Sequence, residues 1–194
     1  LVIAKIIYPE KNKENINTKI DIQIDKNKEN ILEALGNGAT DGLRLAANIA
    51  AMLIAFVALI SLINYMLSIA GTSLEIILGY IFMPLAFLMG APWSDAGILG
   101  SLLGQKLVLT ELVAYKNLSA MEVGGLNGIS EKTAILASYA LCGFANFASI
   151  GIQLGGIGSI APERKKDLAK LVTKAMFGGA LASWLTATIA GILI

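Results

Sequence analysis

Residues 104–118 read GQKLVLTELVAYKNL, an apolar helical pattern that carries a single carboxylate, Glu111. The surrounding sequence is strongly apolar, since 56% of the 194 residues are hydrophobic and only 15% are charged. A charged side chain in membrane-like sequence is costly, and it usually faces a bundle interior or a water-filled cavity on a substrate or ion path. Glu111, flanked by Thr110 and Tyr115, is therefore the first candidate for a functional residue.

The composition as a whole predicts an all-α integral membrane protein. Few charges and 20 glycines in an apolar chain are typical of transmembrane helices. The sequence has no histidine and one cysteine, Cys142, which excludes Ser-His-Asp and Cys-His catalysis, an internal disulfide and a cysteine-based zinc site. We therefore expect no enzyme activity and assign no metal ligands. The net charge of +1, without a basic stripe interleaved with aromatic residues, argues against nucleic acid as a partner.

Two helical spans are expected in 36–90. The segment 46–69 is uncharged over 24 residues, and about 20 such residues cross a bilayer. A second apolar segment, 74–90, contains Pro84 as a possible kink. A final span is expected at 175–194, after a basic stretch that the excess of Lys and Arg places in the cytoplasm.

The segment 91–132 predicts a re-entrant helical hairpin. Ser94 or Asp95 is a plausible cap for a short helix at 96–103, and a second short helix runs through 111–118. We expect the polar, glycine-containing residues 104–106 to form the tip between them. Irregular backbone at membrane depth is tolerated only where protein or a cavity surrounds it.

The segment 133–194 is predicted to contain a broken helix and the final span. The residues CGFANF, 142–147, interrupt an apolar helical pattern with glycine and a polar amide. Such an interruption is the best sequence indication of a transporter binding site. At the other end, 1–7 is interpreted as the end of a preceding helix and 8–35 as a polar connecting segment, so we expect the sequence to belong to a longer protein.

The hairpin and the broken helix together offer one candidate site. Asn146 and Ser149 are three residues apart and share a helical face if the helix resumes there. With Glu111 they provide a carboxylate, an amide and a hydroxyl, which suit the adjacent hydroxyls of a sugar. Phe144 is placed to pack against the sugar ring.

Each of these residues also has a structural interpretation. Glu111 is a structural carboxylate if it pairs with Lys106 or Lys116. Asn146 is a helix cap, and Ser149 a packing or back-bonding hydroxyl, if the break serves the fold alone.

Four strings in the sequence resemble the concentrative nucleoside transporter family. They are GATDGLRLAANIAAMLIAFVALI (38–60), GQKLVLTELVAYKNL (104–118), ALCGFANFASIGIQLGGIGSIAPERKKDL (140–168) and TATIAGIL (186–193). They occur in the family's order and cover most of the chain. The resemblance implies that 1–194 is the nucleoside transporter C-terminal domain, half of the transporter fold, with the second re-entrant hairpin and the second broken helix.

The resemblance implies a cation-coupled nucleoside symporter that imports nucleosides by alternating access. Members are homotrimers, so a nucleoside, a lipid membrane and two further copies are the expected partners, in a multi-pass arrangement in a bacterial plasma (inner) membrane. No covalently bound cofactor is implied. Na+ or H+ is the coupling ion, and its site lies mostly upstream of this chain.

The resemblance also implies residue roles. The positions of Glu111, Asn146 and Ser149 bind ribose hydroxyls in the family, and that of Phe144 lines the pocket. Thr110 stands where the family often has asparagine, which affects the local hydrogen bonding. The alternative is a non-transport membrane gate or assembly module that reuses the fold; a membrane enzyme acting on nucleosides is disfavoured.

Overall fold

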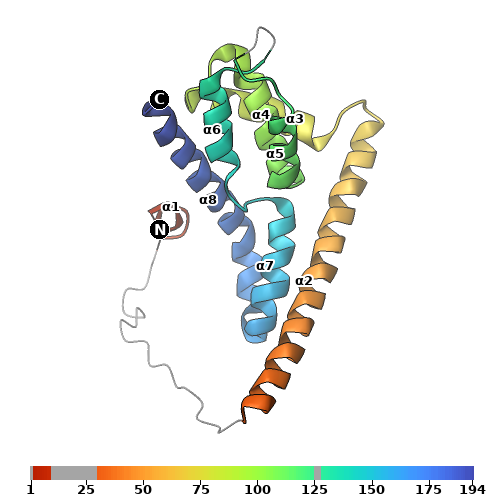
Figure 1. Cartoon of the computed structure of the whole chain (residues 1–194). Coiled ribbons are helices and arrows are strands. Elements are labelled where there is room, and N and C mark those ends of the chain that lie inside the picture. Colours follow the sequence, from red (N-terminus) through yellow and green to blue (C-terminus); the bar gives the residue numbers. More distant parts are fainter. Residues whose placement is uncertain (1, 10–29, 125–127) are drawn as a thin grey trace.

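The computed structural model describes residues 2–9, 30–124 and 128–194, and the regular elements of these ranges are helices (Figure 1). The helices are α1 (Val2–Ile7), α2 (Ile31–Ser68), α3 (Leu74–Leu88), α4 (Trp93–Val108), α5 (Glu111–Ser119), α6 (Glu131–Leu141), α7 (Phe147–Ile160) and α8 (Lys165–Ile192), with a 3-10 turn at Pro162–Arg164 before α8. The predicted all-α architecture is confirmed for these residues.

The helices form two groups beside one long helix (Figure 1). Helices α3 to α6 pack together at one end of the molecule, and α7 lies beside the first part of α8 at the other end. Helix α2 runs alongside and packs against α7. This contact is close, because a Cβ at Gly151 or Gly155 would lie 3.0 Å from a backbone oxygen of α2, in Met52 or Asn48 respectively.

Two helices in the described ranges are long and apolar enough to cross a membrane, Ile31–Ser68 and Pro162–Ile192. Helix α2 begins at Ile31, inside the segment 8–35 that was expected to connect, and most of that segment, 10–29, lies outside the described residues. Helix α8 begins at Lys165 and is thus longer than the predicted span at 175–194. Helix α3 has 15 residues, fewer than the about 20 that a full span needs.

Glycine contacts hold α3 and α4 together along the first arm of the hairpin. A Cβ at Gly100 would lie 2.6 Å from the carbonyl oxygen of Gly79 and 2.8 Å from the backbone nitrogen of Met83. A Cβ at Gly104 would lie 2.8 Å from the carbonyl oxygen of Glu75. Small residues allow such close backbone approach, which is how helices associate where no water drives them together.

The structure corrects the predicted hairpin tip. Helix α4 runs without interruption through 104–106, and the chain turns at Leu109 and Thr110 instead. Gly104 lies inside the helix, and its lack of a side chain allows the close contact with α3. The second arm, predicted at 111–118, is confirmed as α5.

The start of the hairpin differs from the prediction as well. Pro92 is the N-cap of α4, so neither Ser94 nor Asp95 has that role. Asp95 is buried, and its Oδ2 accepts hydrogen bonds from the backbone N–H of Ser130 (2.9 Å), the Ser130 hydroxyl (2.7 Å) and the Thr133 hydroxyl (2.8 Å). The carboxylate therefore joins the first turn of α4 to the N-terminus of α6, where the helix dipole favours a negative charge.

Replacing Gly100 by alanine is expected to destabilise the α3–α4 pair by about 1–3 kcal/mol, because the new methyl group overlaps backbone that cannot move independently. The midpoint of thermal unfolding of the detergent-solubilised protein measures the change. Gly97→Ala, on the same helix, is the matched control, since a Cβ there has nothing within 4 Å. Its midpoint should stay the same or rise, because alanine favours a helix by about 1 kcal/mol over glycine. Equal midpoints for the two variants would contradict the close contact.

Candidate functional site

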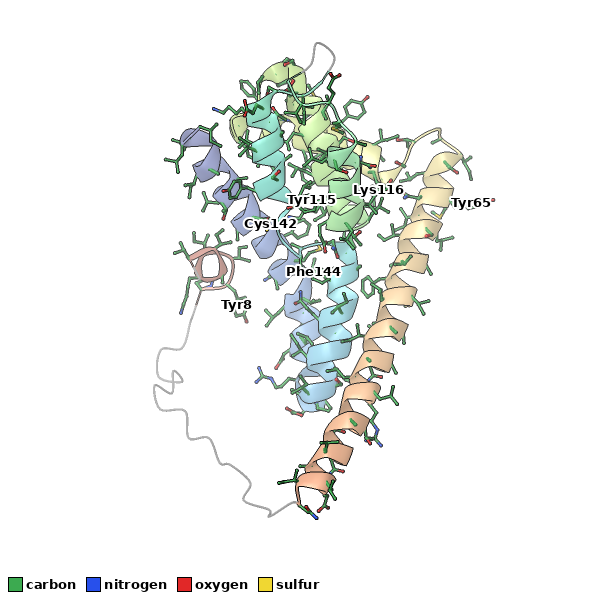
Figure 2. All side chains as sticks on the ribbon, in the orientation of Figure 1. Tyr8, Tyr65, Tyr115, Lys116, Cys142 and Phe144 are labelled. Carbon is green, nitrogen blue, oxygen red and sulfur yellow. The ribbon has the colours of Figure 1, made fainter. Side chains whose placement is uncertain are left out.

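The candidate site lies where the hairpin turn meets the gap between α6 and α7. Helix α6 ends at Leu141 and α7 begins at Phe147, so the predicted interruption of the helix is confirmed. Figure 2 shows Cys142 and Phe144 on the segment between the two helices. Within it, the N–H of Gly143 donates to the carbonyl of Leu141 (2.7 Å), and the N–H of Ala145 donates to the carbonyl of Gly143 (2.9 Å).

Asn146 and Ser149 start the second half of the broken helix through a capping box. The Asn146 Oδ1 accepts a hydrogen bond from the backbone N–H of Ser149 (2.7 Å), and the Ser149 hydroxyl oxygen accepts one from the backbone N–H of Asn146 (3.3 Å). The Ser149 hydroxyl donates to the carbonyl of Asn146 (2.6 Å). Both side chains are buried. Capping is therefore one role of this pair, as the structural interpretation of the sequence allows.

Asn146 also contacts the hairpin. Its Nδ2 donates to Oε2 of Glu111 over 3.0 Å, across 35 positions of sequence. Glu111 lies in the first turn of α5 and remains partly exposed. Its other oxygen, Oε1, accepts no hydrogen bond from the side chains and backbone that the structure describes. Three of the predicted residues, Glu111, Asn146 and Ser149, are thus brought into one hydrogen-bonded series with an accessible carboxylate at its end.

Thr110 and Phe144 lie at the edges of this series. Thr110 caps α5, with its hydroxyl oxygen accepting from the N–H of Val113 (3.4 Å). It also lines a cavity of about 250 Å³ between α2, the hairpin turn and α7, together with Ile60 and Ala148. Phe144 is 58% exposed, so its ring is available for contact with a ligand or with another part of the protein.

A buried lysine beside the site was not predicted as a functional residue. Lys106 is 1% exposed, and its ammonium group donates to the carbonyl of Ala140 (2.8 Å) and to the hydroxyl of Ser183 (2.9 Å). The sequence suggested it only as a partner for Glu111, and no ion pair between the two is formed within the described residues. The signal that singled out Glu111, a charge in an apolar helix, applied equally to Lys106.

The site is suited to binding a polar group without chemical change. The partly exposed carboxylate of Glu111 can accept a hydrogen bond through Oε1, and the amide of Asn146 behind it has one further N–H to donate. In the part of the chain that the structure describes, no three His, Cys, Asp or Glu side chains come together to hold a metal ion. Direct contact of Ser149 with a ligand stays a prediction, because its hydroxyl closes the capping box.

Comparison with protein families gives one match over almost the whole chain. The family described as "Na+ dependent nucleoside transporter C-terminus" matches residues 1–191. The "Uncharacterized transporter YutK" of Bacillus subtilis is 46% identical over 203 residues, which cover 100% of this chain and 49% of that protein. The "Nucleoside permease NupC" of Helicobacter pylori is 43% identical over 204 residues, covering 100% of this chain and 48% of that protein.

A solved structure has the same arrangement of helices. A variant of the transporter CNTnw in its intermediate 3 state superimposes with a TM-score of 0.80 at 40% identity, over 98% of this chain and 47% of that one. The chain therefore spans about half the length of these three proteins. The predicted fold class, a helical membrane protein with half of a transporter fold, is confirmed.

The hydrogen bond between Asn146 and Glu111 can be tested by exchanging the amide and the carboxylate groups between the two positions. Asn146→Asp keeps an oxygen for the α7 cap but places a second carboxylate against Glu111. We therefore expect the free energy of unfolding to fall by about 1–3 kcal/mol, which lowers the unfolding midpoint. Adding Glu111→Gln restores an N–H donor facing the new carboxylate. The double variant should therefore recover most of the loss, as measured by thermal unfolding of the purified protein. Additive destabilisation in the double variant would contradict the contact.

Proposed function

Because this chain belongs to the Na+ dependent nucleoside transporter family, we propose that it supplies the ribose-binding part of a cation-coupled nucleoside symporter. The transporter would import nucleosides by alternating access and is not an enzyme. The observation that carries this proposal is the hydrogen bond from Asn146 to Glu111, which joins the hairpin turn to the broken helix. Two neighbouring ribose hydroxyls fit the carboxylate and the amide that meet there.

The proposed pocket uses the predicted residues in different ways. Glu111 accepts a ribose hydroxyl through Oε1. Asn146, which is buried in this structure, offers its second amide hydrogen to the adjacent hydroxyl oxygen when the segment before α7 opens on binding. Ser149 holds Asn146 in place through the capping box and bonds the ribose if that box opens on binding. Phe144 covers the ring of the ligand from the segment between α6 and α7, and Thr110 fixes the start of α5.

The coupling ion and the assembly are parts of the same proposal. We favour Na+ over H+, since the family is described as Na+ dependent, with the ion held mostly by residues outside this chain. A multi-pass homotrimer in a bacterial plasma membrane is the proposed setting. The alternative, a gate or assembly module without transport, predicts a folded protein that binds no nucleoside.

Glu111→Gln in the complete transporter is expected to reduce uridine uptake by about 10- to 100-fold, because a neutral amide replaces the charged acceptor of a ligand hydrogen bond. Labelled uridine uptake into proteoliposomes measures this, under an imposed Na+ gradient and separately under an H+ gradient. Glu131→Gln, an exposed carboxylate at the start of α6, is the matched control and should transport normally.

The two gradients, together with a measurement of uridine binding to the purified transporter, separate the remaining possibilities. Uptake driven by one gradient alone identifies the coupling ion. Normal uptake by Glu111→Gln would refute its role in binding. Absence of both uptake and uridine binding in the folded wild-type protein would refute the symporter proposal and favour the gate or assembly module.

A further inference from the structure

Lys106 occupies an unusual position for a charged residue. It is the largest fully buried side chain among the described residues. Its ammonium group has two neutral oxygen partners, the Ala140 carbonyl and the Ser183 hydroxyl. Burying an ammonium group without a paired opposite charge is strongly unfavourable. The molecule therefore retains a costly charge at a point where α4, α6 and α8 meet.

The end of α6 accounts for how the charge is tolerated. Ala140 lies in the last turn of α6, where carbonyl groups lack intrahelical partners and the helix dipole is negative. A carbonyl at the end of a half-helix is also the kind of ligand with which transporters hold Na+ at broken helices. The lysine ammonium group, which is covalently attached to the chain, occupies the position beside the Ala140 and Ser183 oxygens, so no exchangeable ion is needed there.

The hairpin thus holds the broken helix on both sides of its interruption. Before the interruption, Lys106 bonds Ala140; after it, Glu111 bonds Asn146. Gly143 lies between these two contacts, and a Cβ there would come within 3.4 Å of the Lys106 nitrogen and 3.0 Å of the Ser183 Cβ. The glycine leaves the room that the ammonium group and its partner occupy.

We propose that Lys106 is a tethered cation that positions the Glu111–Asn146 pair, so that this half of the site is ordered without a bound ion. Lys106 is a positioning residue and does not touch the ligand. The part of this inference that concerns ligand recognition rests on the proposed function. Its structural part, a charge that holds the segment 141–146, can be measured without transport.

The first test compares uridine with 2′,3′-dideoxyuridine, which lacks both hydroxyls that the pair would bind. In the complete transporter, Lys106→Met should reduce the ratio of uridine to dideoxyuridine uptake by about tenfold, since uridine alone loses hydrogen bonds to a charged group. Lys116→Met, an exposed lysine on α5, is the matched control and should keep the wild-type ratio. An unchanged ratio in folded Lys106→Met, or an equal loss for both nucleosides, would overturn the proposal.

Two further variants separate the charge from the hydrogen bonds and cover the case in which Lys106→Met does not fold. Lys106→Gln keeps N–H donors but no charge and should show the same loss of discrimination as Lys106→Met. Ser183→Ala removes one partner of the ammonium group and should change the ratio in the same direction, by less. A wild-type ratio in Lys106→Gln would overturn the role of the charge.

The second test is independent of nucleosides. Cys142 is exposed and lies between the two contacts, so its alkylation by N-ethylmaleimide reports how firmly the segment is held. Peptide mass spectrometry of the labelled protein should show faster modification of Cys142 in Ser183→Ala, which keeps the lysine charge beside the thiol, than in wild type and Lys116→Met. Equal rates would overturn the positioning role. If wild-type protein transports no nucleoside but the rates differ as expected, the proposed function fails while the positioning role of Lys106 stands.

Discussion

The structure depends on one constraint, that backbone polar groups released by a break in a helix must find partners in apolar surroundings. The break between α6 and α7 releases carbonyl groups on one side and N–H groups on the other. Lys106 meets the first need through Ala140, and the side chains of Asn146 and Ser149 meet the second. The functional groups of the candidate site are therefore also the groups that allow the break to exist.

Local sequence chemistry predicted the elements whose signals lie within a few residues. The interruption at 142–147 follows from glycine and asparagine in an apolar pattern, and the second hairpin arm follows from the apolar helical pattern of 111–118. The turn of the hairpin was misplaced because Gly104 has two possible roles. Only the presence of α3 at its surface shows that this glycine serves packing and not a turn.

A local sequence pattern could not predict which residues the buried charges contact, because these partners are distant in the sequence. Lys106 bonds residues 34 and 77 positions away, and Asp95 bonds residues 35 and 38 positions away. The sequence identified each charge as an exception in an apolar chain but gave no means of choosing its partner. Glu111 shows the same limit, since the sequence offered two lysines as partners and the structure gives Asn146.

The contact between Glu111 and Asn146 also links ligand recognition to the thermodynamics of folding. The two residues are 35 positions apart and meet only when the hairpin has packed on the broken helix. A molecule that bridges them binds the assembled state and not the unfolded chain, so at a hundred times its dissociation constant it stabilises the fold by about 2.7 kcal/mol. Melting temperature thereby becomes an assay of affinity, and candidate ligands can be ranked in detergent solution without vesicles or gradients.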